Sequence, residues 1–195
     1  FPPPSSGHIA VMQILGLQER ASAVASPLAD KLPSADWLHT YTEAARLAYA
    51  DRAQYVADPE FVPAPAGRWT SLLDDAYLKQ RASLIGAQSM GTAKPGVPAG
   101  ASSAFAPQMQ QSESGTSHIS IVDAPGRALA RTTTIEDVFG ARLMSDGGTG
   151  KAGGFLLNNQ LTDFSMAPAD AEGKAIANRV QPGKRPRSST SPMLV

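Results

Sequence analysis

A glycine followed by a threonine, where a polar stretch gives way to a strand pattern, constrains this 195-residue chain more than any other feature. Residues 117–122 alternate polar and apolar side chains, which predicts a β-strand. Scission of the Gly115–Thr116 bond would place a free α-amine beside the Thr116 hydroxyl, where the amine can act as general base. Because Thr116 is internal, we expect either an uncut precursor or two joined pieces.

Composition limits the classes of protein to which the chain can belong. Hydrophobic residues make up 42%, so a buried core is expected, and the formal net charge of +0 does not favour nucleic acid or an anionic membrane as partner. The absence of cysteine excludes disulfides and thiolate chemistry, and the three histidines lack ligand spacing, so no metal or cofactor is expected. The sequence shows neither an apolar run long enough to span a bilayer nor a signal peptide, and its opening residues read as mid-protein sequence.

The first part of the chain predicts three helices. One begins after Gly7, one begins near Ser34, and one follows the capping-box pattern of Ser71 and Asp74. Prolines and a glycine between residues 59 and 67 predict irregular backbone before the third helix. The expected inward faces are Val11, Ile14, Leu15 and Leu17; Trp37, Tyr41, Ala44, Ala45 and Ala48; and Ala76, Tyr77 and Leu84.

A change in composition divides the chain into three parts. Residues 86–114 are rich in Gly, Ala, Ser, Pro and Gln and have no periodicity, which predicts a segment that buries little apolar surface and tolerates cleavage. We therefore expect a helical region at 1–90, a flexible linker at 91–115 that ends at the cleavage site, and a β-rich region at 116–195.

The β-rich region predicts a hairpin that starts at Thr116. Pro125 and Gly126 have the order of a type II turn, and residues 128–135 form a threonine-rich second strand, so residues 134–136 are expected opposite Thr116 and Ser117. Residues 153–158 predict a short buried strand. Residues 147–152 resemble a phosphate loop but lack its first glycine and its final hydroxyl, so we interpret them as a hairpin loop. The tail from Ala167 is expected to be loop-like.

Several motifs follow one another in a family order: PPPSSG at 2–7, GTSHISIVD at 115–123, TTTI at 132–135, FG at 139–140, LLNNQ at 156–160, DFS at 163–165 and KRPRSSTSP at 184–192. Each motif is weak alone. Together the chain resembles the γ-glutamyltransferases, the glutathione hydrolases of the N-terminal nucleophile superfamily. The resemblance places it at the end of the large subunit and the start of the small catalytic subunit, and implies an α+β fold, the αββα sandwich, here incomplete. Helices before Gly86 are then expected to cover a sheet built mainly after Thr116.

The resemblance also implies a role for each matching residue. Thr116 is the expected nucleophile and new N-terminus after cleavage at Gly115, with Thr134 hydrogen-bonded to its hydroxyl. The expected substrate contacts are Gln160 and Asp163 to the α-amino group, and Ser188 and Ser189 to the α-carboxylate.

The chain departs from the family pattern at four positions. Glu136 stands where the family has asparagine, and its carboxylate can still accept hydrogen bonds from the substrate ammonium. Thr162 replaces an acid, His8 replaces a glycine, and Arg187 replaces an apolar residue next to the serine pair. Asn158 and Asn159 are expected to shape the loop that presents Gln160 and Asp163.

The implied activity is hydrolysis of a γ-glutamyl amide such as glutathione, or its transfer to an amine, through a threonine ester. The alternatives are a β-lactam (cephalosporin) side-chain acylase, a γ-polyglutamate hydrolase, and an uncleaved relative without catalysis. The implied partners are the small-molecule substrate, its water or amine acceptor, and the remainder of both subunits, in a periplasmic or extracellular location. The family's oxyanion glycines lie beyond Val195 and its carboxylate-binding arginine lies before Phe1, so the 195 residues alone are expected to be a poor catalyst.

Overall fold

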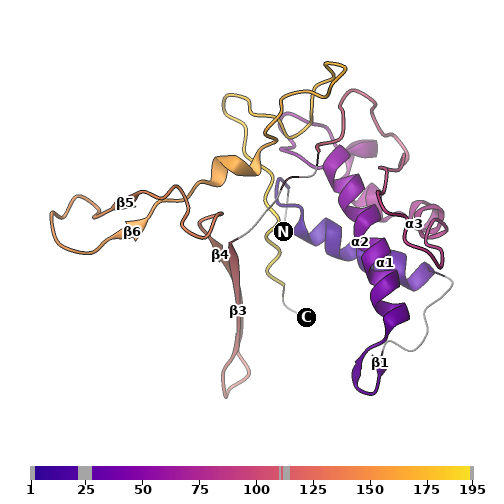
Figure 1. Ribbon diagram of the computed structural model, residues 1–195, viewed down its shortest axis with the longest axis horizontal. Helices are drawn as coiled ribbons and strands as arrows, with labels where there is room; N and C mark the ends of the chain where they lie inside the picture. The colour runs from indigo at the N-terminus through magenta and orange to yellow at the C-terminus, as the bar shows by residue number, and fades with distance from the viewer. Residues whose placement is uncertain (1–2, 22–27, 110, 112–114, 194–195) are drawn as a thin grey trace.

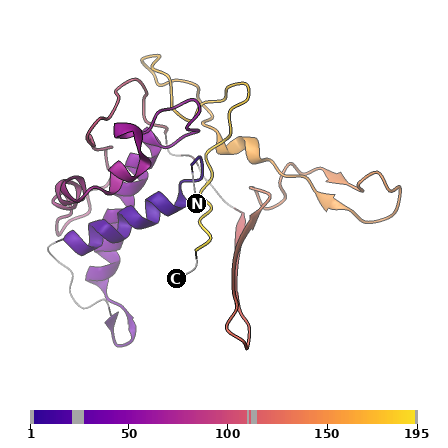
Figure 2. The same ribbon diagram turned by 180° about the vertical axis from the view of Figure 1, so that it is seen from behind.

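The computed structural model describes residues 3–21, 28–109, 111 and 115–193, with its α-helices before the predicted cleavage site and its longest strands after it. Parts of the predicted linker (residue 110 and residues 112–114) and of the first motif (Pro2) lie outside the described residues. The helices form one body, and two hairpins project away from it (Figure 1; Figure 2 shows the same from behind). The molecule therefore has two regions with different packing.

Three helices and two 3₁₀ turns build the helical region. These are α1 (Gly7–Arg20), α2 (Ala35–Tyr55), η1 (Pro65–Gly67), η2 (Trp69–Leu73) and α3 (Asp75–Ala82), with a small hairpin, β1 (Leu28–Ala29) and β2 (Leu32–Pro33), before α2. Leu17, Leu47 and Leu78 meet between the helices and are almost fully buried. These apolar contacts hold α1, α2 and α3 together.

The predicted helices exist, but their buried faces and starts differ in part from the prediction. The inward face of α1 includes Ile14 and Leu17 as predicted, whereas Leu15 is 49% exposed, because the residue after Ile14 points about 100° further round the helix. Ser34 caps α2 as predicted, accepting a hydrogen bond from the Trp37 amide. The prediction that Trp37 and Tyr41 pack in the core is wrong: Tyr41 is exposed and its ring stacks on that of Trp37 at 5.4 Å.

The third helix begins later than the capping-box pattern predicts. Ser71 lies inside η2, where its hydroxyl donates to the Pro65 carbonyl instead of capping a helix. Asp74 is the N-cap position of α3 but its side chain makes no capping bond, and Leu84 is exposed beyond the end of α3. The pattern therefore located a helix but misplaced its first turn.

A buried carboxylate fastens the start of the linker to the helices. Asp51 accepts hydrogen bonds from Gln13, Tyr77, Arg81 and the Gly96 amide at 2.6–3.0 Å. Burial raises the pKa of Asp51, and the nearby Arg81 guanidinium opposes that rise. Among the described residues of 86–109, Pro98 and Ala106 are also buried, so the expectation that this segment buries little apolar surface is wrong. The boundaries of the three parts stay a prediction.

The strand region consists of separate two-stranded sheets. Strands β3 (Thr116–Val122) and β4 (Ala128–Thr134) pair antiparallel, with Thr116 opposite Thr134 as predicted. Ser117 faces Thr133, one residue from the predicted range, because the turn hydrogen bond runs from the Gly126 amide to Asp123 and the loop has three residues. Gly126 takes the expected positive φ, +87°.

Strands β5 (Met144–Ser145) and β6 (Phe155–Leu156) form a second hairpin around the predicted loop at 147–152. The expectation that residues 153–158 are buried is wrong, since Phe155 is 58% exposed. Within the described residues, moreover, the helices do not cover a sheet: every residue of β3 is exposed, and each strand pairs with only one other. The described residues thus contain helices and hairpins of the expected sandwich, but not its stacked layers.

The tail is irregular, as predicted, but it packs on the helical region. The last residues of this tail (the yellow trace in Figure 1) run between the helices and the β3–β4 hairpin. Ile176 and Ala177 are buried, Ala177 within a cluster that contains Ala57 and Val62 from the segment after α2. This contact holds the tail on the helical region, and residues 188–191 then lie near Thr116 at the start of β3.

Candidate active site

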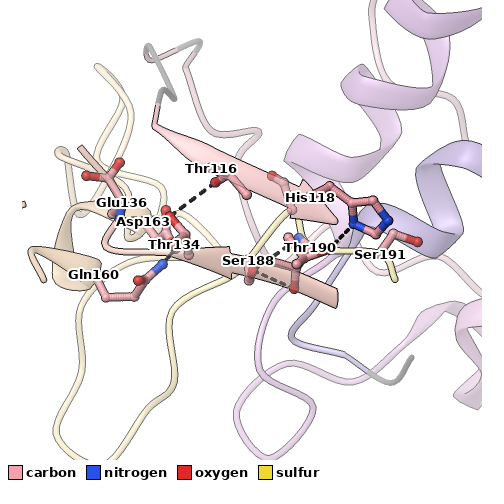
Figure 3. Close-up of a pocket in the computed structure, with 11 residues that line it drawn as sticks. Thr116, His118, Thr134, Glu136, Gln160, Asp163, Ser188, Thr190 and Ser191 are labelled. Atoms are coloured by element: carbon pink, nitrogen blue, oxygen red, sulfur yellow. Dashed lines mark hydrogen bonds between the residues drawn. The ribbon is translucent and has the colours of Figure 1, made fainter. Parts of the chain in front are cut away.

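A cavity of about 300 Å³ lies where the β3–β4 hairpin, the 3₁₀ turn η3 (Gln160–Asp163) and the C-terminal segment meet. Figure 3 shows side chains from all three elements turned toward this space. Every expected nucleophile and substrate-contact residue is on the cavity wall. The lining residues are Thr116, His118, Thr132, Thr134, Glu136, Gln160, Asp163, Ser188, Ser189, Thr190 and Ser191.

The two threonines predicted as a pair are in contact. Thr116 Oγ1 donates to Thr134 Oγ1 at 3.2 Å, and Thr134 Oγ1 donates to the Gly115 carbonyl oxygen at 3.4 Å (Figure 3 draws the first bond). The direct cross-strand register of Thr116 and Thr134 produces this contact. One hydroxyl thus reaches both the candidate nucleophile and the carbonyl of the candidate scissile bond.

Glycine is required at position 115 by its surroundings. Gly115 has a φ of +101°, and a Cβ built there would collide with the carbonyl oxygen of Glu136. Glu136 itself has a φ of +77°, which is strained for a non-glycine residue, and its amide donates to Thr134 Oγ1 at 2.8 Å. The Glu136 amide, in the turn after β4, therefore helps to hold the Thr134 hydroxyl in place.

The two asparagines shape the η3 turn, as the sequence predicts. Asn158 Oδ1 accepts from the Gln160 amide at 3.0 Å, and Asn159 Oδ1 accepts from the Asp137 amide at 2.9 Å. Gln160 Nε2 donates to Asp163 Oδ2 at 2.6 Å, so the two side chains expected to hold an α-amino group lie side by side. The second asparagine bond joins this turn to the end of β4.

The serine pair is held in place by residues from the start of the chain. The Ser6 amide and hydroxyl both donate to the Ser188 carbonyl at 2.8 Å, and an Arg52 Nη donates to Ser189 Oγ at 2.5 Å. A Cβ at Gly7 would collide with the Ser189 carbonyl oxygen, so the first turn of α1 needs a glycine here. Residues before the predicted cleavage site thus support one wall of the cavity from behind without lining it.

Four lining residues were not among the predicted site residues: His118, Thr132, Thr190 and Ser191. His118 Nδ1 lies 2.8 Å from Thr132 Oγ1 across the hairpin. Strand alternation from Thr116 puts His118 on the same face, so the sequence carried a signal for it. For Thr190 and Ser191, the only signal is their closeness to the serine pair.

Two charged groups at the segment that precedes the serine pair have shifted pKa values. Hydrogen bonds from Arg185 lower the pKa of Asp58 to about 2, and the two side chains form an ion pair at 2.7 Å. Burial, with a smaller contribution from the Arg179 charge, lowers the pKa of Lys184 to about 8. Among the described residues no three acidic or histidine side chains gather as a metal site requires. Within the same residues, the helices are too short or too polar to cross a membrane.

Comparison with known proteins is consistent with this geometry. The family model described as gamma-glutamyltranspeptidase matches residues 1–195. The chain belongs to the γ-glutamyltranspeptidase family. It is 37% identical over 198 residues to a glutathione hydrolase proenzyme of Pseudomonas aeruginosa, covering 100% of this chain and 32% of the relative. It is 38% identical over 201 residues to the glutathione hydrolase proenzyme of Escherichia coli K12, covering 100% of this chain and 31% of the relative.

A solved structure shares the fold of this chain. A cephalosporin acylase from Bacillus halodurans superposes with a TM-score of 0.68 at 22% identity, over 97% of this chain and 28% of the acylase chain. The predicted α+β class and N-terminal nucleophile hydrolase fold are therefore confirmed. The chain spans about a third of the length of the curated relatives it matches.

Proposed function

We propose that the whole protein hydrolyses or transfers γ-glutamyl amides through an ester on Thr116, formed after scission of the Gly115–Thr116 bond. The observation that carries the proposal is the single cavity in which the Thr116–Thr134 pair faces Gln160 and Asp163 on one side and the serine pair on another. Glutathione and related γ-glutamyl compounds are the proposed substrates. The remainder of both subunits completes the site.

Scission would use the contact between Thr134 and the Gly115 carbonyl. Thr116 Oγ1 attacks the Gly115 carbonyl carbon, the C–N bond breaks, and the nitrogen takes the proton to become the α-amine of Thr116. Water then hydrolyses the resulting ester and leaves a carboxylate on Gly115. The Thr134 hydroxyl, which donates to that carbonyl oxygen, polarises the bond at the start of the reaction.

Turnover would repeat this chemistry on the substrate amide. Thr116 Oγ1 attacks the γ-carbonyl, its proton passes to the Thr116 α-amine and then to the leaving amine, and the acyl group stays on Thr116 as an ester. Water or a second amine attacks that ester and restores the hydroxyl. Division of one acyl transfer into two steps is the advantage of the covalent route.

The polar groups of the cavity suit the two charges of a γ-glutamyl group. The Asp163 and Glu136 carboxylates and the Gln160 carbonyl oxygen can accept from an α-ammonium, and the hydroxyls of Ser188 and Ser189 can donate to an α-carboxylate. These groups occupy different walls of the cavity. A ligand with both charges on one carbon would contact both walls.

The test uses the full-length protein with two measurements. Mass spectrometry should find a fragment that begins at Thr116, and γ-glutamyl-p-nitroanilide should be cleaved much faster than glutaryl-p-nitroanilide, which lacks the α-amine. Faster cleavage of the glutaryl amide would favour the acylase alternative. An intact chain without turnover of either amide would contradict the proposal and favour the non-catalytic alternative.

A further inference from the structure

A fully buried asparagine, Asn178, lies between the two walls of the cavity without lining it. Its side-chain Nδ2 donates to the Asp163 carbonyl oxygen at 2.8 Å, and its Oδ1 accepts from the Arg187 amide at 3.2 Å. Asp163 belongs to the wall proposed to bind the α-amine, and Arg187 directly precedes the wall proposed to bind the α-carboxylate. One side chain therefore bonds to the backbones of both walls.

A third contact joins Asn178 to the other side of the predicted cleavage site. Gln108 Oε1 accepts from Asn178 Nδ2 at 3.1 Å and from an Arg187 Nη at 2.9 Å. The Arg187 guanidinium also donates to the carbonyls of Arg52 and Val56 at the C-terminal end of α2, at 3.0 and 3.3 Å. Gln108, Asn178 and Arg187 are all buried, and they fix this connection to the helical region.

The geometry leaves little freedom for the two walls to move apart. Both hydrogens of the Asn178 amide and its oxygen are engaged, and an apolar side chain in its place would leave the Asp163 carbonyl and the Arg187 amide without these bonds. The backbone of residues 163–165 also pairs with this segment, since the Ser165 amide donates to the Asn178 carbonyl at 2.9 Å. The distance between Asp163 and the serine pair is thus set at Asn178.

We propose that Asn178 is a positioning residue that sets the separation between the amine-binding and carboxylate-binding walls, with Gln108 and Arg187 holding it against the helical region. This inference rests on the proposed function. A ligand that uses both walls depends on their separation, whereas a ligand that uses one wall does not. L-glutamate carries both the α-amine and the α-carboxylate and would contact both walls. Glutarate lacks the α-amine and would contact only the carboxylate-binding wall.

The experiment measures binding of L-glutamate and of glutarate by calorimetry to the cleaved full-length protein. In Asn178→Leu we expect the Kd of L-glutamate to rise about tenfold and that of glutarate to change less than about twofold. Gln108→Leu is a milder variant, because Gln108 bonds to Asn178 and not to Asp163. It should also raise the Kd of L-glutamate more than that of glutarate, but by less than Asn178→Leu does. Gln13→Leu is the matched control, because it removes another buried amide, bonded to Asp51, outside the cavity.

Kinetics provide a second readout. The KM for γ-glutamyl-p-nitroanilide should rise in Asn178→Leu while kcat changes less than about threefold, since the Thr116–Thr134 contact is not touched. If Asn178→Leu does not fold, as judged by its melting temperature, Gln108→Leu decides the question. Equal weakening of both ligands, no weakening, or the same selectivity in Gln13→Leu would overturn the inference.

The two proposals can fail separately. Binding of L-glutamate requires no turnover. If Asn178→Leu weakens L-glutamate more than glutarate as expected, but the wild-type protein does not cleave the amide, only the proposed function is contradicted. If the wild-type protein cleaves the amide but Asn178→Leu weakens L-glutamate and glutarate equally, only the role of Asn178 is contradicted. Failure of the wild-type protein to bind L-glutamate would overturn the inference about Asn178.

Discussion

The helical region and the β3–β4 hairpin differ in how far their side chains are buried. Leu17 and Leu47 are almost completely buried among α1, α2 and α3, whereas every residue of β3 is exposed. Nevertheless the hairpin carries Thr116, the proposed nucleophile, and none of the described residues of the helical region lines the cavity. Stability and chemistry are thus assigned to different parts of this chain.

Residues 184–191 connect these two parts. Arg185 pairs with Asp58, Ser188 accepts from Ser6, and both partners belong to the helical region, while the serine pair faces the hairpin across the cavity. A rigid core can hold one wall of a site whose nucleophile stands on a less buried element. Substitutions in each part of the chain test how far this division extends.

The largest expected effect is on chemistry alone. Thr116→Ala should abolish scission and lower γ-glutamyl-p-nitroanilide hydrolysis by about 10⁴-fold or more, because no hydroxyl remains to form the ester. Thr116→Ser should retain both activities at a reduced rate. Since Thr116 is exposed, the urea unfolding midpoint should not change in either variant. A large loss of stability in Thr116→Ala would contradict the view that the hairpin supplies chemistry and the helical region supplies stability.

The second effect concerns stability alone. Leu47→Ala should lower the free energy of unfolding by about 2–5 kcal/mol, because it opens a cavity between α1, α2 and α3. The matched change on the hairpin, Ile121→Ala, should cost less than about 0.5 kcal/mol in this chain, since Ile121 is 50% exposed. Urea unfolding of the 195-residue chain measures both values. Equal losses would show that the hairpin is as well packed as the helices.

The third effect concerns the connection between the two regions. Hydrogen bonds from the Arg185 side chain and from the Arg185 and Glu60 amides lower the pKa of Asp58 from 3.8 to about 2, so this set of bonds contributes about 2 kcal/mol at pH 7. That contribution is present above about pH 4 and disappears as the pH falls through about 2. The stability difference between wild type and Asp58→Asn, measured by urea unfolding, should therefore be full at pH 6 and nearly absent at pH 2. A difference independent of pH would contradict this role.

The smallest effect concerns backbone strain beside Thr134. Glu136→Asn should stabilise the chain by about 1 kcal/mol, because asparagine tolerates a positive φ better than glutamate. The KM for γ-glutamyl-p-nitroanilide should rise at the same time, since a carboxylate facing the substrate ammonium is lost. Arg142→Asn, at another positive φ outside the cavity, is the control and should stabilise without changing KM. Destabilisation by Glu136→Asn would show that the Glu136 side chain holds the turn.

Local patterns predicted the elements that depend on neighbouring residues. Strand alternation and the Pro125–Gly126 turn placed Thr134 opposite Thr116, and Ser34 capped α2 where the sequence indicated. The same reasoning missed the burial of Pro98 and the exposure of Phe155. Composition describes what a segment can bury by itself, whereas these residues take their burial from segments far away in the chain.

The sequence by itself determined the hairpin, the presence of three helices and the ordered motifs that mark the family, because short-range geometry and residue type are sufficient for each. Only the tertiary structure decided that Ser6 and Arg52 hold the serine pair, and that Asn178 lies between the two walls of the cavity. Such contacts join residues up to 182 positions apart. No local pattern encodes them, because they arise only when the tail packs back onto the end of α2.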